Sequence, residues 1–131
     1  MIIDSSAILA ILYQETDAGY FAEAIVKATV CRMSAANFLE AAINIDTKGD
    51  SEASRQLDTL IRRTDIQIEP VTLEHAQIAR QADQDFGKGR HPAGLNFGDC
   101  CAYALAKSQA EPLLFKGDDF VKTDITLYQA K

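Results

Sequence analysis

The sequence lacks any long hydrophobic run, and it does not begin like a secretion signal. No apolar segment approaches the ~20 residues that a membrane helix requires. The N-terminus MIIDSSAILAILY has an acid at its fourth position and no basic stretch, unlike a signal peptide. We therefore expect no membrane segment and no association with a membrane.

Cysteine is also scarce, with Cys31, Cys100 and Cys101 as the three residues of this type. An odd number with two adjacent members does not suit a disulfide framework, and no C-x-x-C pair indicates zinc. The simplest interpretation is a cytoplasmic protein with reduced cysteines.

Positive charge is in deficit, because 13 Lys and Arg stand against 19 Asp and Glu, which gives a net charge of −6. This balance excludes a generic cationic coat for nucleic acid. It does not exclude a nuclease, because bound metal ions can offset a local cluster of acids. His75 and His91 have no partner at the spacing of a nucleophile–base pair or a metal site, so they offer no competing mechanism.

The length of 131 residues predicts one domain over residues 1–131, without repeats or linkers. Apolar or β-branched runs alternate with segments of helical periodicity. Strands are expected at 1–3, 29–33, 66–71, 112–115 and, as a last short one, 125–128. Helices are expected directly after residue 4, after Thr16 or Asp17, after Ser34, over 51–64, after Thr72 and over 99–108, with a long loop at 87–98. The alternation predicts an α/β fold with a mostly parallel sheet covered on both faces, whose ligand site lies beyond the carboxyl ends of the strands.

Several acids fall at positions where such a site would form. Asp4 follows the first strand, and Asp118 and Asp119 follow the strand at 112–115. Glu40 lies inside an otherwise apolar helix, on one polar stripe with Asn37 and Asn44 and without a basic partner within a turn. Asp99 begins the helix after the glycine-rich loop.

Each acid also has an ordinary structural interpretation. Asp4 and Asp99 are typical helix caps, Glu40 alone would fit a solvated helix face, and Gly-Asp-Asp is a common turn. Together, however, the acids suit a hard divalent cation, since Mg²⁺ and Mn²⁺ prefer oxygen ligands. Converging carboxylates without an ion would repel one another and raise each other's pKa. With an ion, the cluster can activate water beside a phosphate.

Four ordered segments carry a family resemblance: MIIDSSAILAIL, CRMSAANFLEAA, LNFGDCCAYALAK and PLLFKGDDFVKTDI. In these segments, over essentially its whole length, the chain resembles the PIN-domain ribonucleases, specifically the VapC-type toxins of toxin–antitoxin pairs.

The resemblance implies a parallel sheet of four to five strands with helices on both faces. It implies an acidic site made by Asp4, Glu40 and Asp99 with a fourth acid, for which Asp118 is the first choice and Asp119 the alternative. Ser6 and Asn96 are expected to lie beside these acids as supporting or turn residues. The activity implied is Mg²⁺- or Mn²⁺-dependent cleavage of phosphodiester bonds in RNA, often transfer or ribosomal RNA. The partners implied are a VapB-type antitoxin, which inserts a basic side chain among the acids, and a second copy of the chain in a homodimer.

The loop at 87–98 has a further interpretation as a contact with the RNA backbone through Lys88 and Arg90, against that of a flexible surface loop. The helices over 17–28 and 51–64 are candidates for dimer or antitoxin contact if they expose apolar faces. Two other functions compete with the nuclease. A receiver-like domain would need a phosphate-accepting Asp near Val71, where the sequence has Glu69-Pro70-Val71-Thr72. A non-catalytic dimeric binding module would leave Glu40 unexplained.

Overall fold

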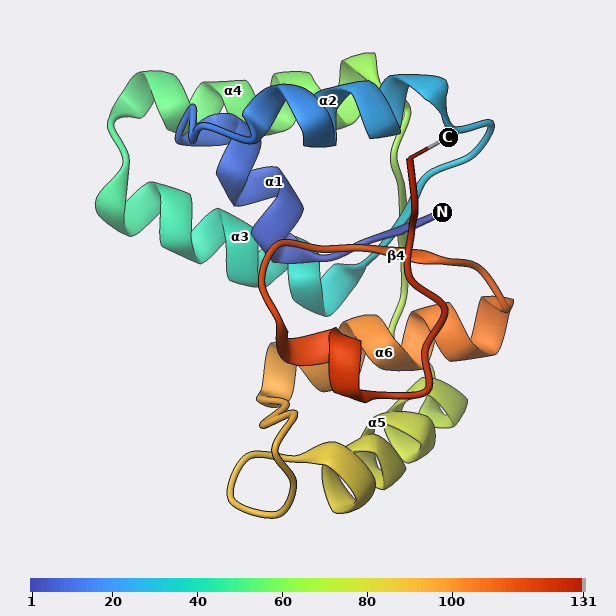
Figure 1. Ribbon diagram of the computed structural model, residues 1–131. Helices are drawn as coiled ribbons and strands as arrows, with labels where there is room; N and C mark the ends of the chain where they lie inside the picture. The colour runs from blue at the N-terminus through green and yellow to red at the C-terminus, as the bar shows by residue number, and fades with distance from the viewer. Residues whose placement is uncertain (131) are drawn as a thin grey trace.

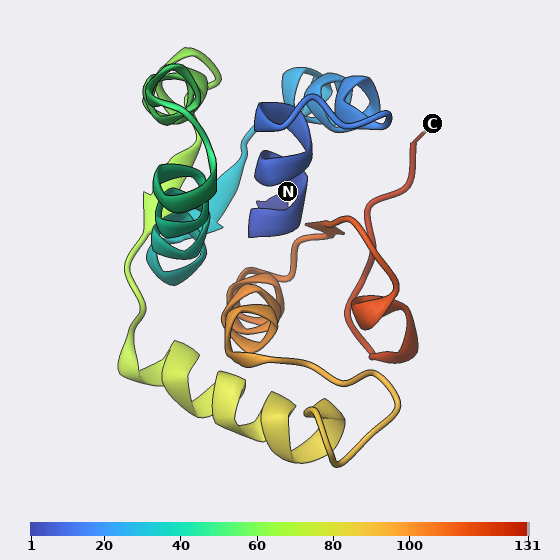
Figure 2. The ribbon, with the colours of Figure 1, turned by 90° about the vertical axis from the view of Figure 1, so that its left-hand side faces the viewer.

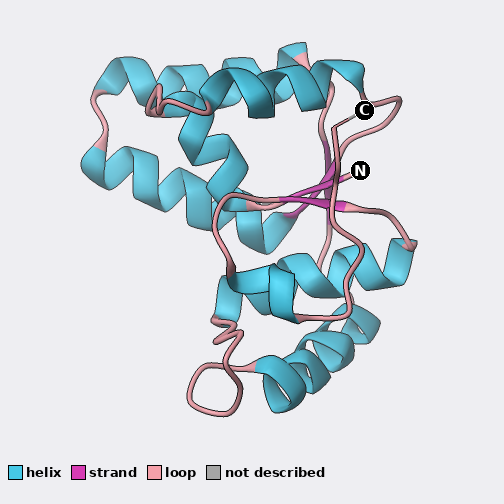
Figure 3. Cartoon of the chain, viewed as in Figure 1, coloured by secondary structure: helices cyan, strands magenta, loops and turns pink. Residues whose placement is uncertain are grey.

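The computed structural model describes residues 1–130 and has one four-stranded sheet at its centre. The strands lie in the order β3-β2-β1-β4, and every neighbouring pair is parallel. Ile2 at the centre of the sheet is paired with Arg32 on one side and Leu113 on the other. The strands, drawn in magenta in Figure 3, are β1 (Ile2–Ile3), β2 (Arg32–Ser34), β3 (Gln67–Glu69) and β4 (Leu113–Leu114).

Helices cover both faces of this sheet (Figure 1). The first four helices lie on one face, α6 lies on the other, and α5 packs on the outer side of α6 (Figures 1 and 2). The bounds are α1 (Ser5–Leu12), α2 (Ala18–Lys27), α3 (Ala35–Lys48), α4 (Ser51–Arg63), α5 (Leu73–Phe86), α6 (Phe97–Gln109) and a short 3-10 helix η1 (Asp119–Lys122). The predicted α/β fold with a parallel sheet between helices is confirmed.

Alternation along the strands divides the core into two parts. Successive side chains of a strand point to opposite faces. Ile3 and Leu114 accordingly pack with the α1–α4 layer, whereas Ile2 and Leu113 pack with α5 and α6. All four side chains are essentially buried, so the short strands are anchored from both sides.

The helix starts follow the capping chemistry predicted from the sequence. The side chains of Asp4, Ser34 and Thr72 each accept a hydrogen bond from a backbone N–H in the first turn of the helix that follows. Such caps satisfy donors that the first turn leaves free. Asp17 stands at the cap of α2 without a capping hydrogen bond within residues 1–130, and its Oδ1 instead accepts a hydrogen bond from Lys116 Nζ at 3.0 Å.

Three predicted elements differ from the structure. The strand expected at 29–33 occupies Arg32–Ser34, where β1 and β3 both offer a pairing edge. The helix expected to begin at Asp99 begins at Phe97, because Asn96 is its cap and Asp99 is its third residue. The strand expected at 125–128 is reduced to a single bridge between Leu113 and Leu127.

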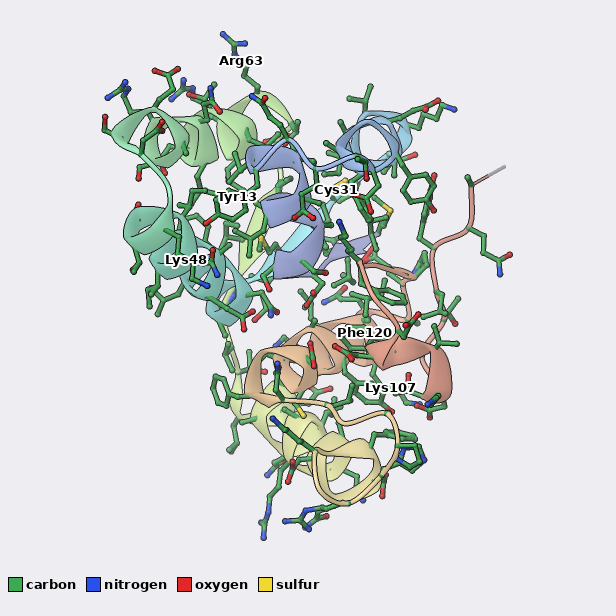
Figure 4. All side chains as sticks on the ribbon, turned by 60° about the vertical axis from the view of Figure 1, so that its left-hand side comes forward. Tyr13, Cys31, Lys48, Arg63, Lys107 and Phe120 are labelled. Atoms are coloured by element: carbon green, nitrogen blue, oxygen red, sulfur yellow. The ribbon has the colours of Figure 1, made fainter. Side chains whose placement is uncertain are left out.

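The structure bears on both the membrane segment and the cysteines. No helix within residues 1–130 combines the length and apolar character needed to cross a membrane. The three cysteines are all buried and unpaired, and Cys31 lies in the core on the α1 side of the sheet (Figure 4).

Candidate active site

Asp4 connects the end of β1 to the start of α1 and is only 4% exposed. Its Oδ2 accepts hydrogen bonds from the backbone N–H of Ser6 at 3.0 Å and from Ser6 Oγ at 2.6 Å. Ser6 Oγ in turn accepts from the backbone N–H of Lys116, just after β4, at 2.9 Å. The carboxylate is therefore fixed between the ends of two adjacent strands.

The other carboxylate oxygen of Asp4 is not satisfied. Oδ1 is buried and has no hydrogen-bond partner within residues 1–130. Burial raises the pKa of Asp4 to about 6, against the lowering effect of the Ser6 hydrogen bonds, and the negative charge of Glu40 raises it further. A buried oxygen without a partner is costly, so it marks a place for a cationic ligand.

Glu40 projects from the second turn of α3 toward the start of α1. Its Oε1 accepts a hydrogen bond from Ser5 Oγ at 2.5 Å and a longer one from Asn37 Nδ2 at 3.5 Å. The residue is exposed overall, yet its carboxylate lies against Ser5, the neighbour of Asp4. In the otherwise apolar helix predicted around it, Glu40 is thus an acid whose carboxylate points to the junction of β1 and α1.

Asp99 stands in the first turn of α6 and is 8% exposed. Its Oδ2 accepts from the backbone N–H of Asn96 at 3.1 Å, and Asn96 Oδ1 accepts from the N–H of Asp99 at 2.9 Å. This reciprocal pair is a capping box. Burial raises the pKa of Asp99 to about 7, and the charges of Asp4, Asp119 and Glu40 add to the increase.

Gly98 lies in the first turn of α6, between the cap residue Asn96 and Asp99, and its backbone lies against Glu40. A Cβ at position 98 would overlap the Glu40 carboxylate. The Gly98 carbonyl also accepts a hydrogen bond from Asn37 Nδ2 at 2.9 Å. A larger residue at this position would require the Glu40 side chain to move away, so glycine lets the first turn of α6 approach the acid of α3 this closely.

The two acids after β4 differ in their relation to the cluster. Asp118 precedes η1 and makes no capping hydrogen bond to the described residues, whereas Asp119 is the first residue of η1. The charge of Asp119 acts on Asp99. Phe120, 2% exposed, anchors η1 beneath β4 through an edge contact with Phe115 at 5.0 Å between ring centroids (Figure 4).

The structure thus gathers acids from β1, α3, α6 and the turn after β4. The grouping is indicated by the effect of the charges on the pKa of Asp4 and Asp99, and by the hydrogen bond to Glu40 from Ser5, the neighbour of Asp4. As the side chains stand, no three His, Cys, Asp or Glu residues within 1–130 surround one point at the distances of ion ligands. Carboxylates with raised pKa values, as in Asp4 and Asp99, are suited to exchanging protons for a cation.

The basic residues expected to contact RNA lie beside this cluster rather than in it. Lys88 lines an apolar groove of about 500 Å³ between α5 and α6, together with Asn96 and Phe97. Arg90 lies within 3.7 Å of Asp83 and forms an exposed ion pair with it. The groove therefore extends from Asn96, the cap residue of α6, to Lys88 in the glycine-rich loop.

Three residues that contact the acids were not singled out from the sequence as site residues. Ser5, Asn37 and Gly98 all touch the Glu40 carboxylate or would overlap it if enlarged. The available signals were the three-residue spacing of Asn37 and Glu40 on one helix face, and a glycine directly before Asp99.

The comparisons with known proteins agree on one class of fold. The sequence model of the family described as PIN domain matches residues 1–125. VapC20 of Mycobacterium tuberculosis, whose structure is described as that of a Sarcin-Ricin loop cleaving toxin, superposes with a TM-score of 0.79 and covers 98% of both chains at 15% identity. VapBC2 from Rickettsia felis, bound to a promoter DNA fragment, gives a TM-score of 0.76 at 11% identity over 99% of this chain and 98% of the other. At these identities the likeness concerns the fold.

Relatives in sequence narrow the class. Ribonuclease VapC28 of Mycobacterium tuberculosis is 52% identical over 126 residues, which cover 95% of each chain. Ribonuclease VapC of Mycolicibacterium smegmatis is 45% identical over 125 residues, or 95% of this chain and 97% of the other. The chain therefore belongs to the PIN-domain family and, within it, to the VapC ribonucleases. This assignment decides against the receiver-like domain and the non-catalytic binding module.

Proposed function

We propose that the chain is an endoribonuclease toxin that hydrolyses phosphodiester bonds of RNA with the help of Mg²⁺ or Mn²⁺. The observation that carries the proposal is Asp4 Oδ1, a buried oxygen without a hydrogen-bond partner among the described residues, in a carboxylate on which the charge of Glu40 acts and whose own charge acts on Asp99. Such oxygen donors suit hard divalent cations and offer nothing to a soft metal. We also propose that residues 1–131 act as one PIN domain.

The residues that would hold the ion are Asp4, Asp99 and Glu40, with Asp119 as the fourth acid. Asp119 is preferred to Asp118 because its charge acts on Asp99. When bound, a divalent ion supplies a more acidic water and neutralises charge on the scissile phosphate. Ser6 and Asn96 serve the site by fixing the carboxylates of Asp4 and Asp99.

The chain's own contribution to the reaction is orientation and proton transfer. Glu40 is more exposed than Asp4 or Asp99, and within residues 1–130 the hydrogen bonds to its carboxylate, from Ser5 and Asn37, both end on Oε1. Its Oε2 is therefore placed to accept a proton from the water whose oxygen attacks phosphorus. As the new P–O bond forms, the bond to the leaving ribose oxygen breaks, and that oxygen takes a proton from solvent.

The test is cleavage by the purified protein and by the Asp4→Asn variant, combined with sequencing of RNA ends after brief induction in cells. We expect wild-type ends at defined positions in transfer or ribosomal RNA, and loss of these ends with Asp4→Asn or with excess chelator. The substitution keeps the capping hydrogen bond and removes the charge. Undiminished cleavage by Asp4→Asn, or by wild type in excess chelator, would contradict the proposal.

The same cleavage assay distinguishes the two acids of the turn. Asp119→Asn is expected to lower the rate by about 10-fold or more, the size typical of losses around a metal site. Asp118→Asn is the matched control, because Asp118 is the neighbouring acid, is exposed, and makes no capping bond to the described residues. Its cleavage rate should stay within a few-fold of the wild-type rate. If Asp118→Asn instead lowers the cleavage rate more than Asp119→Asn does, Asp118 is the fourth acid.

An antitoxin and RNA are the partners proposed. Two structural neighbours are described as a toxin–antitoxin complex from Klebsiella pneumoniae and as VapBC2 from Rickettsia felis. An antitoxin arginine entering the acid cluster could replace the charge of the ion. Lys88, which lines the groove, and Arg90, which is paired with the groove residue Asp83, are the proposed contacts to the RNA backbone. A small reading frame directly upstream, whose product blocks cleavage in the same assay, would identify the antitoxin.

We propose further that the protein is a homodimer acting in the cytoplasm, where its RNA substrates are. The large apolar side chains exposed on α3, before and within α5, and on α6 are Leu39, Ile43, Val71, Leu73 and Phe97, the last 82% exposed. The helices predicted from the sequence to make dimer or antitoxin contacts are α2 and α4. Of these, α2 exposes Tyr20 and Val26, whereas Leu57 of α4 is buried. Association through the first set would cover an apolar groove that Val71 and Phe97 both line. A monomer in sedimentation velocity would contradict the dimer.

A further inference from the structure

Asn37 is the most deeply buried polar residue of α3. It lies in the first turn of the helix, is 0% exposed, and precedes Glu40 by three residues on the same face. It carries no charge, and its side chain contacts the same oxygen of Glu40 as Ser5 does. The proposed reaction assigns it no part.

Its amide contacts two different parts of the acid cluster. Nδ2 donates to the carbonyl oxygen of Gly98 at 2.9 Å and, more weakly, to Glu40 Oε1 at 3.5 Å. Gly98 belongs to α6 and is the neighbour of Asp99. One side-chain amide therefore ties the helix that carries Glu40 to the turn that carries Asp99.

Packing alone does not account for an asparagine at this position. Asn37 Oδ1 is buried and has no hydrogen-bond partner in the part of the chain that the structure describes. An unsatisfied buried polar atom costs about 1–3 kcal/mol. A leucine of nearly the same shape would remove this unpaired oxygen but would also take away the 2.9 Å hydrogen bond to the Gly98 carbonyl. The contact with Gly98, rather than packing, is therefore what distinguishes the amide.

The opposite side of the contact is equally restricted. Gly98 has no room for a Cβ because the Glu40 carboxylate occupies that space. The Glu40 carboxylate thus contacts Ser5 Oγ and Asn37 Nδ2 and lies against the backbone of Gly98. Of these, only Asn37 also bonds to α6.

We propose that Asn37 is a positioning residue, which sets the place of Glu40 relative to Asp99 and thereby the affinity of the acid cluster for a divalent cation. The proposal rests on the metal-dependent function proposed above. Partners that orient metal ligands without touching the ion commonly change its affinity by 10- to 100-fold. Asn37 would act through Glu40 and through the Gly98 turn, with no contact to the RNA.

The test measures Mn²⁺ binding to the Asn37→Leu variant. Binding is monitored as the rise of the thermal unfolding midpoint with increasing Mn²⁺ concentration. We expect the Mn²⁺ concentration needed for half of the full rise to increase by about 10-fold or more. The metal-free midpoint should change no more than in Asn44→Leu. This control removes an asparagine seven residues later on α3, whose Oδ1 accepts from Tyr13 and not from the cluster. A merely structural role would lower the metal-free midpoint and leave the Mn²⁺ dependence unchanged.

The route through Glu40 is tested by repeating the measurement in a Glu40→Gln background. Residues that act together give non-additive effects. Adding Asn37→Leu to Glu40→Gln should therefore weaken Mn²⁺ binding by less than 3-fold. Wild-type affinity in Asn37→Leu, or the full loss again in the Glu40→Gln background, would overturn the inference and leave the proposed function intact. A wild-type protein that shows no Mn²⁺-dependent stabilisation would instead overturn the proposed function itself.

Discussion

Asp99→Asn is expected to abolish RNA cleavage and, in metal-free buffer, to make the protein more stable. The carboxylate is 8% exposed and carries a pKa of about 7, so at pH 8 its ionised form is held in the fold at a cost. Asparagine removes that charge, and its Oδ1 can still accept the capping hydrogen bond from the N–H of Asn96. The rise of the pKa from 3.8 to about 7 corresponds to roughly 4 kcal/mol, at about 1.4 kcal/mol per pKa unit, which is the upper limit of the gain.

Cleavage should nevertheless fall by more than about 100-fold, because even residues that only support metal ligands cost 10- to 100-fold when removed. Thermal unfolding at pH 8 with chelator, beside a cleavage assay with Mn²⁺, measures both effects. Asp58→Asn, at an exposed position of α4, is the control for loss of a carboxylate. A loss of thermal midpoint as large as that from a core cavity would show that Asp99 is structural.

The stability of the metal-free protein should fall as the pH rises from about 4 to about 7. Asp4 and Asp99 have ordinary pKa values of 3.8 when unfolded, and about 6 and about 7 when folded. The folded state therefore holds these protons more tightly. Their contribution to the free energy of unfolding is fully present below pH 4 and is lost as the pH passes through the folded values.

Divalent ions should reverse this trend, because they compete with protons for the same carboxylates. Stabilisation by Mn²⁺ should increase from pH 5 to pH 8, and binding at pH 6 should release protons. Calorimetric titrations in buffers of different ionisation enthalpy count these protons, and midpoints at several pH values give the stability. In the Asp4→Asn, Asp99→Asn double variant the decline between pH 4 and 7 should be smaller. A decline of the same size in this variant would place its cause outside the acid cluster.

Much of the fold could be read from local chemistry. Asp4, Ser34 and Thr72 cap helices where residue type alone placed them, because capping depends on a few neighbouring backbone groups. The alternation of apolar runs with helical periodicity was enough for a parallel sheet between helices. Arg32–Ser34 and 125–128 were predicted less well, since the ends of a strand depend on which neighbours are there to pair with it.

The candidate site divides in the same way. Its acids were visible because a carboxylate at a strand end or inside an apolar helix is unusual for the segment that carries it. The proposed preference for Asp119 over Asp118 depends on the charge of Asp119 acting on Asp99 across the fold, which no local pattern reveals.

What the amino-acid order alone determined is a set of short apolar strands, each followed by a helix start, with acids at the junctions. Parallel strands carry their carboxyl ends to one edge, so the acids of β1 and of the turn after β4 had to come near each other. Only the packed molecule decided that Glu40 and Gly98 touch and that Asn37 bridges α3 to α6. Those contacts join residues about 60 positions apart, and they depend on how closely two helices on opposite faces of the sheet approach at its edge.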